Sequence, residues 1–312
     1  MSVDTYDAVV VGGSWAGLSA ALQLARARRR VLVVDSGLPR NRFAAASHGF
    51  LGQDGRTPAE ILDTARVQVL AYPAAEFRRG QATEAALGKT VPNDHFEVAL
   101  GSGVAVRTRR LVLATGVVDE LPNIPGVPER WGKTVLHCPY CHGYEVAGTR
   151  LGVLAVGAPS VHQALLLPDW STDVTLFTNN ALELTADEQG ALAARGVHIE
   201  PRPVVGLVGE GSALSGVRLA GADGGDEVVG LDALFTASRT RMASPIAEQL
   251  GCAFDDGPFG PVIRTDERKE TSIPGVYAAG DIARVKHNAT WASADGVMAG
   301  ISAHQSLALA PA

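Results

Sequence analysis

A glycine-rich turn near the N-terminus, set between two apolar segments, most constrains the fold of this chain. Residues 8–11 are all apolar and predict a buried strand, and residues 12–17 turn it into a helix expected over residues 17–28. Residues 31–34 form a second apolar strand that ends in Asp35. An acidic residue about 20 residues after such a turn is typical of the βαβ unit that binds dinucleotides. The chain therefore begins as a parallel α/β fold.

The turn itself reads Gly-Gly-Ser-Trp-Ala-Gly and has Ser14 where the usual pattern has its middle glycine. Gly12 permits the tight turn and Gly17 permits close packing of the helix on the strand, while the helix N-terminus offers N–H groups to a pyrophosphate. Ser14 still presents its backbone N–H, although its Cβ narrows the approach. Asp35 is suited to accept hydrogen bonds from ribose hydroxyls. An ordinary βα turn is the alternative interpretation.

A second strand–helix–strand pattern follows a stretch rich in proline and glycine, residues 121–128. We therefore predict two Rossmann-like, three-layer α/β domains, the second inserted into the first. The expected first domain comprises residues 1–117 and 241–312, and the expected second domain comprises residues 118–240. The sequence further predicts strands over residues 111–114, 151–156 and 174–177, and helices over residues 58–69, 159–170 and 290–308.

Composition narrows the classes of function. The 312 residues carry a net charge of −6 with no dominant basic stripe, which argues against nucleic acid and acidic membrane surfaces as partners. The N-terminus is polar and acidic, and no apolar run approaches a membrane span. Three cysteines are too few for a secreted disulfide scaffold of this length. We expect a cytoplasmic protein without a signal peptide.

Two of the cysteines stand in the motif His137-Cys138-Pro139-Tyr140-Cys141-His142. A helix that begins at the first cysteine stabilises a thiolate, and two thiols at this spacing interconvert between dithiol and disulfide. The flanking histidines leave a metal site as an alternative, but four ligands within six residues do not easily wrap a tetrahedral ion. A structural disulfide is the other alternative. We favour redox chemistry and no metal, and we expect the remaining cysteine, Cys252, to be a buried small hydrophobe.

Five motifs occur in the order seen in the thioredoxin reductase-like flavoproteins, and the chain resembles that family over essentially its whole length. They are residues 12–17, Asp35, residues 114–116, the Cys-x-x-Cys and Gly280-Asp281. The resemblance implies FAD, with Asp281 bonded to the ribityl chain. It also implies that Cys141 lies against the flavin while Cys138 exchanges with substrate. The residues that we expect at the FAD are Gly12, Gly13, Ser14, Ala16, Gly17, Asp35, Ser36, Arg40, Asn41, Arg42, His48, Ala114, Thr115, Gly116, Gly280, Asp281, Ala289 and Thr290.

The residue after the second cysteine refines the resemblance. Thioredoxin reductases proper usually carry Asp there, whereas this chain has His142, followed by Gly-Tyr-Glu. The pattern is more similar to the dithiol oxidases of gliotoxin, holomycin and romidepsin biosynthesis. That resemblance implies a homodimer that oxidises a small-molecule dithiol and passes the electrons to O₂. Histidine is suited to proton transfer near neutral pH, so we expect His142 to be catalytic beside Cys138 and Cys141. A purely structural histidine is the alternative.

The second βα turn lacks the features of a nicotinamide nucleotide site. It reads Ala155-Val156-Gly157-Ala158-Pro159-Ser160, so Ala155 stands where the first motif glycine is expected and Ser160 stands at the position of the last small residue. No lysine or arginine occurs over residues 151–194 to pair a 2′-phosphate, although arginines elsewhere are able to substitute. The sequence thus favours a dithiol oxidase. An NADPH-dependent reductase of the thioredoxin reductase type is the alternative, and a flavoprotein redox sensor without turnover is a third class.

Overall fold

The computed structural model describes residues 4–88, 95–221 and 224–309, so the first three residues of the expected polar N-terminus lie outside the described residues. The chain divides into two compact units. The first comprises Met1–Arg42, Pro58–Val118 and Thr240–Ala312, and the second comprises Phe43–Thr57 and Asp119–Arg239. The chain enters the second unit within strand β7 (Val117–Glu120) and returns within β16 (Arg239–Met242).

The first unit is built on a sheet in the order β3-β2-β1-β6, in which all neighbours are parallel. β5 pairs antiparallel with the first half of β6, and β19 pairs parallel with its second half. The strands are β1 (Thr5–Val11), β2 (Val31–Asp35), β3 (Ala75–Arg79), β4 (Ala82–Leu87), β5 (Phe96–Leu100), β6 (Ala105–Leu113) and β19 (Val276–Ala278). A hairpin of β17 (Phe254–Gly257) and β18 (Gly260–Ile263) also belongs to this unit.

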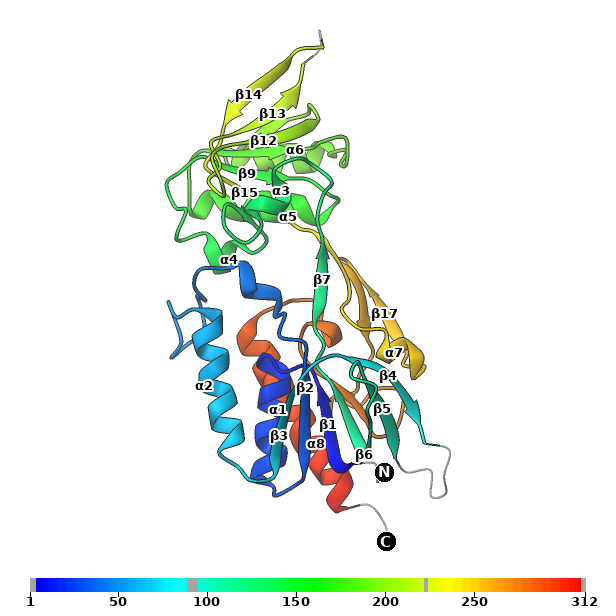
Figure 1. The fold of residues 1–312 in the computed structure, drawn as a ribbon. Helices are drawn as coiled ribbons and strands as arrows, with labels where there is room; N and C mark the ends of the chain where they lie inside the picture. The colour runs from blue at the N-terminus through cyan, green and yellow to red at the C-terminus, as the bar shows by residue number, and fades with distance from the viewer. Residues whose placement is uncertain (1–3, 89–94, 222–223, 310–312) are drawn as a thin grey trace. The chain divides into compact units, whose positions relative to one another are not determined.

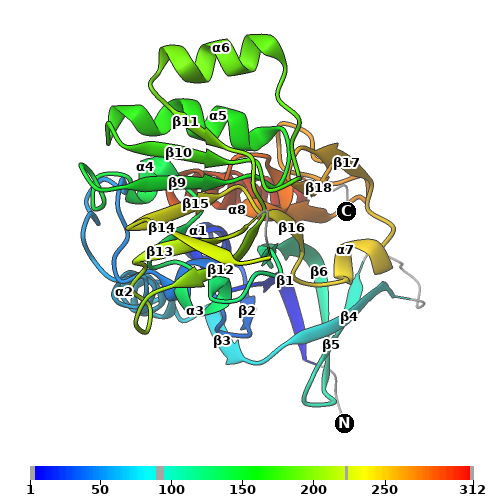
Figure 2. The same ribbon diagram turned by 90° about the horizontal axis from the view of Figure 1, so that it is seen from above.

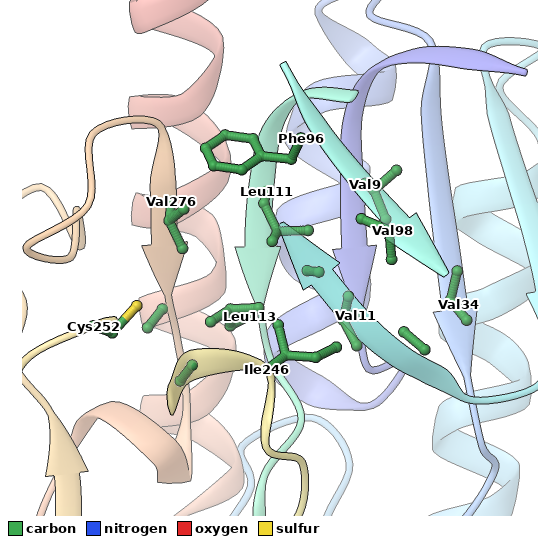
Figure 3. Packing of buried hydrophobic residues seen from close by; sticks show 14 of the residues in the cluster. Val9, Val11, Val34, Phe96, Val98, Leu111, Leu113, Ile246, Cys252 and Val276 are labelled. Atoms are coloured by element: carbon green, nitrogen blue, oxygen red, sulfur yellow. The ribbon is translucent and has the colours of Figure 1, made fainter. Parts of the chain in front are cut away.

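Strand alternation gives the sheet two apolar faces. Val9 and Val11 point to one face, where they pack with β5, β6 and the short helix α7 (Ile246–Gln249) (Figure 3). Ala8 and Val10 point to the other face, which is covered by helices (Figure 1). These are α1 (Trp15–Arg26), α2 (Pro58–Leu70) and α8 (Ala289–Ala308). Cys252 lies buried in the first of these clusters, as the sequence predicts.

α1 and α8 lie side by side (Figure 1) because glycines on α8 remove the side chains between them. A Cβ at Gly300 would lie 2.6 Å from the carbonyl oxygen of Ala20, and a Cβ at Gly296 would overlap the carbonyl of Ala16. The terminal helix predicted over residues 290–308 is confirmed. The first helix begins at Trp15 and ends at Arg26, two residues before each predicted bound, because Ser14 already takes the N-cap position.

The second unit contains a parallel sheet in the order β11-β10-β9-β15-β8. Its strands are β8 (Val135–Leu136), β9 (Leu151–Leu154), β10 (Val174–Phe177), β11 (His198–Glu200) and β15 (Ala233–Thr236). Helices α5 (Pro159–Leu166) and α6 (Ala186–Ala194) lie side by side and cover one face (Figure 2). An antiparallel sheet of β12 (Val204–Val208), β13 (Gly216–Ala220) and β14 (Asp226–Gly230) covers the other. The predicted pair of Rossmann-like α/β folds is confirmed.

Two local predictions need correction. The strand predicted over residues 151–156 ends at Leu154, since the backbone turns toward α5. The helix predicted over residues 159–170 is α-helical only to Leu166 and continues as a 3₁₀ turn, η2 (Leu167–Asp169), because Pro168 cannot donate an α-helical hydrogen bond. No helix in the described part of the chain combines the length and apolarity needed to cross a bilayer.

Residues 43–57 lie in a different unit from the one expected, because the sequence analysis placed them in the first domain. Their contacts group them with the second unit. A Cβ at Gly132 would lie 2.7 Å from Cβ of Phe43, and the Nε2 atom of His48 lies 3.4 Å from Oε1 of Glu145. These are long-range side-chain contacts, which no local sequence pattern reports.

Candidate cofactor and redox site

The first βα turn has a backbone that only glycine accommodates at two positions. Gly12 has φ 104°, in the region that side chains avoid, and a Cβ there would overlap the Ala114 carbonyl. A Cβ at Gly17 would overlap the carbonyl of Gly12. The Ala114 N–H donates to Val11 O at 2.8 Å, which fixes the end of β6 against the turn. The turn is therefore held tightly between β1, α1 and β6, with Ala16 buried in the first turn of α1.

The open end of α1 suits an anion. Ser14 occupies the N-cap without a side-chain capping bond, and the first turn of this fully described helix carries no acidic residue. The N–H groups of a helix N-terminus attract phosphate under these conditions. Asp35 lies beside the turn at the end of β2, where its Oδ1 accepts the Gly13 N–H at 3.0 Å. Ser36 follows it on the surface. The predicted glycines and the acid are thus brought together.

Residues 114–116 follow β6 on the neighbouring side of the turn. Thr115 is half-buried, and Gly116 has φ 71° with nothing within 4 Å of the position that a Cβ would take, so its backbone angle rather than crowding requires glycine. The Gly116 carbonyl accepts the Ala243 N–H at 3.2 Å. The predicted Ala114-Thr115-Gly116 segment therefore borders the turn that begins at Gly12.

Arg40 and Asp281 meet although they are far apart in sequence. Arg40 begins the 3₁₀ turn η1 (Arg40–Phe43), and its Nη1 lies 3.1 Å from Oδ2 of Asp281 and 2.6 Å from Nδ1 of His287. Asp281 begins η3 (Asp281–Ala283), three residues after the end of β19. Beside Arg40, Asn41 has a buried Oδ1 atom without a hydrogen-bond partner. Arg42 is exposed and donates to Pro39 O at 3.0 Å. His287 is a neighbour that the motif analysis did not place at Asp281.

The start of α8 holds a second residue that motif matching missed. The Asn288 side chain caps the helix, and its Oδ1 accepts the backbone N–H of Thr290 at 2.8 Å and of Trp291 at 3.4 Å. The Thr290 N–H, expected at the flavin, is therefore already engaged, whereas Ala289 precedes it in the first turn. Asn is a preferred N-cap residue, so the signal was present in the sequence.

Gly280, with φ 81°, brings its backbone so close to Ala16 that a Cβ would lie 3.0 Å from the Ala16 side chain.

These features fit a dinucleotide in the first unit. The glycine cradle at Gly12 and Gly17 would be filled by any Cβ, the α1 N-terminus is open to an anion, and the buried Oδ1 of Asn41 lacks a partner. A bound dinucleotide is able to supply that missing donor, because its ribose hydroxyls are hydrogen-bond donors. Asp35 and Asp281 provide carboxylates at the ends of β2 and β19.

In the second unit, Cys138 and Cys141 are joined by a disulfide. Cys138 is the N-cap of the short helix α4 (Pro139–His142), with Pro139 in its first position, as the sequence predicts. Both cysteines are partly exposed. Tyr140 is 72% exposed and packs edge-on against Trp170, with ring centroids 5.6 Å apart. The disulfide is therefore accessible on this unit and has an aromatic side chain between its two cysteines.

The segment before the disulfide is fixed to the interior of the second unit. The His137 carbonyl accepts a hydrogen bond from Gln163 Nε2 at 2.6 Å. The imidazole Nδ1 of His137 lies 3.3 Å from the carbonyl oxygen of Thr236. Gln163 and Thr236 are buried polar residues that motif analysis did not single out. Among the described residues, no group of three or more His, Cys, Asp or Glu side chains is arranged to hold a metal ion.

His142 is half-buried at the end of α4. Burial lowers the pKa of His142, the negative charge of Glu145 acts to raise it, and the charge of His48 lowers it further, for a net decrease. A lowered pKa keeps the imidazole neutral near pH 7, the state in which it accepts a proton. His48, expected at the flavin, lies in the second unit and contacts Glu145.

In the second βα turn, a serine side chain of the turn itself occupies one of the backbone N–H groups. Ser160 is fully buried, and its Oγ accepts the Val156 N–H at 3.2 Å, so this N–H is directed inward rather than at a ligand. Arg202, after the adjacent strand β11, is paired with Glu200 at 2.7 Å and Glu227 at 2.5 Å. Its positive charge is therefore already balanced by two carboxylates.

Comparisons with known proteins agree with this arrangement. Residues 6–298 match the family model described as pyridine nucleotide-disulphide oxidoreductase. A protein named thioredoxin reductase tcpT, from Claviceps purpurea, is 36% identical and the alignment covers 94% of this chain and 92% of that protein. The solved oxidoreductase from Agrobacterium tumefaciens is 45% identical with a TM-score of 0.90, covering 98% of this chain and 100% of that one. The solved structure of HlmI is 44% identical with a TM-score of 0.88, and the alignment covers 98% of this chain and 93% of that one.

The match spans both units, and the glycine turn, the disulfide motif and the Gly-Asp pair all fall within it. The chain therefore belongs to the pyridine nucleotide-disulphide oxidoreductase family, as a thioredoxin reductase-like disulfide oxidoreductase.

Proposed function

We propose that this protein is an FAD-dependent dithiol oxidase that closes a disulfide in a small-molecule dithiol. The observation that carries the proposal is the combination, in one unit, of an accessible Cys138–Cys141 disulfide with a βα turn whose Val156 N–H is taken by buried Ser160. With the nicotinamide nucleotide site closed in this way, we take a substrate dithiol as the electron donor. The chain is proposed to work as a homodimer.

The cysteine pair performs the exchange. One substrate thiol attacks Sγ of Cys138, a substrate–Cys138 disulfide forms, and Cys141 leaves as a thiolate. The proton of the attacking thiol passes to His142. The second thiol of the same substrate then attacks the substrate sulfur that is bonded to Cys138. This step releases the product disulfide and leaves Cys138 reduced. Two electrons and two protons have then moved from the substrate to the protein.

FAD bound by the first unit would supply the acceptor for this electron pair, and its reoxidation by O₂ would yield hydrogen peroxide. Gly12, Gly17 and the α1 N-terminus are proposed to hold the pyrophosphate, Asp35 the ribose, and Asp281 the ribityl chain. Support comes from the fit of these residues described above. The proposed cofactor domain is the discontinuous first unit, Met1–Arg42, Pro58–Val118 and Thr240–Ala312, in place of the residues 1–117 and 241–312 expected from the sequence.

The test is anaerobic reduction of the purified yellow protein, followed by absorbance at the flavin band. Dithiothreitol should bleach the flavin, whereas NADPH and NADH should not. Readmitting air should restore the colour with one peroxide formed per dithiol oxidised. Rapid stoichiometric bleaching by micromolar NADPH would reject the oxidase.

An NADPH-dependent disulfide reductase is the second candidate, because a relative that covers nearly the whole chain bears the name thioredoxin reductase. The same experiment separates the two candidates. A reductase would be bleached by NADPH and would then reduce a disulfide substrate.

A further inference from the structure

A loop from the first third of the sequence delivers a histidine to the disulfide-bearing unit. Residues 47–56 close on themselves: the Ser47 N–H donates to Arg56 O at 2.8 Å, and the Gly55 N–H donates to Ser47 O at 2.9 Å. The Gly49 N–H donates to Asp54 Oδ1 at 2.8 Å. Such a closed loop presents its side chains in a fixed arrangement.

His48 is the ionisable side chain that this loop brings to the motif. Its Nε2 lies 3.4 Å from Oε1 of Glu145, and its Nδ1 lies 3.7 Å from Oδ1 of Asp54. His48 is 26% exposed and Glu145 39% exposed, so the contact is only partly screened by water. Glu145 stands three residues after His142, on the turns that follow α4. His48 therefore touches the carboxylate that belongs to the Cys-x-x-Cys-His-Gly-Tyr-Glu motif.

The two residues act on His142 with opposite sign. Burial is the main cause of the lowered pKa of His142; beside it, Glu145, from the same segment, and His48, from the loop, shift that pKa in opposite directions. Glu145 favours the imidazolium form, and His48 disfavours it. Because His48 and Glu145 also contact each other, a change in either alters the field that the other exerts.

We propose that His48 and Glu145 are positioning residues, which set through their opposed charges how readily the His142 imidazole takes up the proton released at the cysteine pair. The inference rests on the proposed function, since it assigns the proton from the substrate thiol to His142. Neither residue needs to touch the substrate. Each acts through His142, whose protonation decides whether the leaving Cys141 thiolate has a neighbouring cation.

The test is a pH titration of the holoenzyme carrying ¹³C-labelled histidine, in which the His142 signal is assigned by its loss in His142→Gln. Glu145→Gln should lower the pKa of His142, because the carboxylate that favours the imidazolium is removed. His48→Gln should raise that pKa, because the opposing charge is removed and Glu145 is no longer shared. The double variant should return toward wild type. Loss of packing alone would move both single variants in the same direction.

Thiol reactivity gives a second readout. In the dithiol-reduced protein at pH 6.5, His48→Gln should speed alkylation by iodoacetamide roughly threefold and Glu145→Gln should slow it by a similar factor, since a neighbouring imidazolium stabilises thiolate. Glu145→Asp keeps the charge and should restore most of the wild-type rate. His198→Gln, on the exposed edge strand β11 of the same unit, is the matched control and should change neither readout.

Shifts in the same direction, or no shift in either variant, would overturn the proposal. Should one variant fail to hold flavin, Glu145→Ala and His48→Asn, which also remove the two charges, supply the comparison instead. Failure of this inference can be distinguished from failure of the proposed function. Flavin bleaching by NADPH would reject the oxidase while leaving opposed His142 shifts intact, and normal peroxide formation without those shifts would reject only the role of His48 and Glu145.

Discussion

The buried carboxylate of Asp295 allows a stability prediction of definite size. Asp295 lies on α8 and is 4% exposed, and its two oxygens bind Arg284 at 2.7 Å and 2.9 Å and Lys269 at 2.9 Å. Asp295→Asn removes the negative charge, keeps the shape, and leaves two cations with no carboxylate between them. Removing one partner of a buried ion pair costs about 3–5 kcal/mol. A loss of this size lowers the melting temperature by roughly 10 °C in a chain of this class.

The same site predicts a pH dependence. Burial alone would raise the pKa of the Asp295 carboxyl, but hydrogen bonds from Arg284 and Lys269 and their positive charges outweigh it, so the net pKa lies below its usual value. A carboxyl whose pKa is lowered by folding contributes stability that is complete above its unfolded pKa of about 3.9 and is lost as the pH falls through the lower folded value. The difference in melting temperature between wild type and Asp295→Asn should therefore be full at pH 7 and shrink below about pH 4.

Thermal melting followed by circular dichroism across pH 3.5 to 8 measures both effects. Asp255→Asn is the control, because Asp255 pairs with Arg264 on the surface, where both side chains are about half exposed. Such pairs contribute about 1 kcal/mol or less. If Asp295→Asn lowers the melting temperature at pH 7 no more than this control does, the reasoning that the Asp295 ion pairs are desolvated is refuted.

Three further predictions concern the cofactor and the cysteines. Gly17→Ala should lower FAD content more than about tenfold in the purified protein, because its Cβ overlaps the Gly12 carbonyl; retained yellow colour would contradict the assignment of the turn. Cys138→Ser should show a long-wavelength charge-transfer absorbance that Cys141→Ser lacks, and the reverse pattern would exchange the roles of the two cysteines. His142→Gln should slow anaerobic flavin reduction by dithiothreitol about 10²-fold or more at pH 6.5, with a smaller loss at pH 9, where substrate thiolate forms unaided. Single-turnover rates equal to wild type at pH 6.5 would leave His142 a structural role.

Local sequence patterns predicted much of the fold. Alternation of apolar residues is not needed for a strand buried on both faces, so the all-apolar residues 8–11 and 31–34 were recognisable as the central strands β1 and β2. The glycines of the first turn were recognisable because backbone crowding there excludes any side chain. Helix ends were predicted less well, as at α5, because capping and 3₁₀ turns depend on a few local hydrogen bonds.

The candidate site was predictable only where its residues stand together in the sequence. The Cys-x-x-Cys motif and the N-cap position of Cys138 follow from a short run of residues, because a proline after the cysteine favours the first turn of a helix. Gln163 and Thr236, which hold His137, carried no such signal. Buried polar residues are recognisable as partners only when the fold shows which backbone group needs them.

By itself, the sequence determined the two strand–helix–strand units, the glycine turn with Asp35, and the spacing of the two thiols, because each depends on neighbours within about 30 residues. Only the tertiary structure decided that residues 43–57 belong to the second unit, that Arg40 meets Asp281, and that His48 meets Glu145. These contacts join segments far apart in the chain. Their partners are chosen by packing of whole elements and by the desolvation of charges, which no local pattern of residue types encodes.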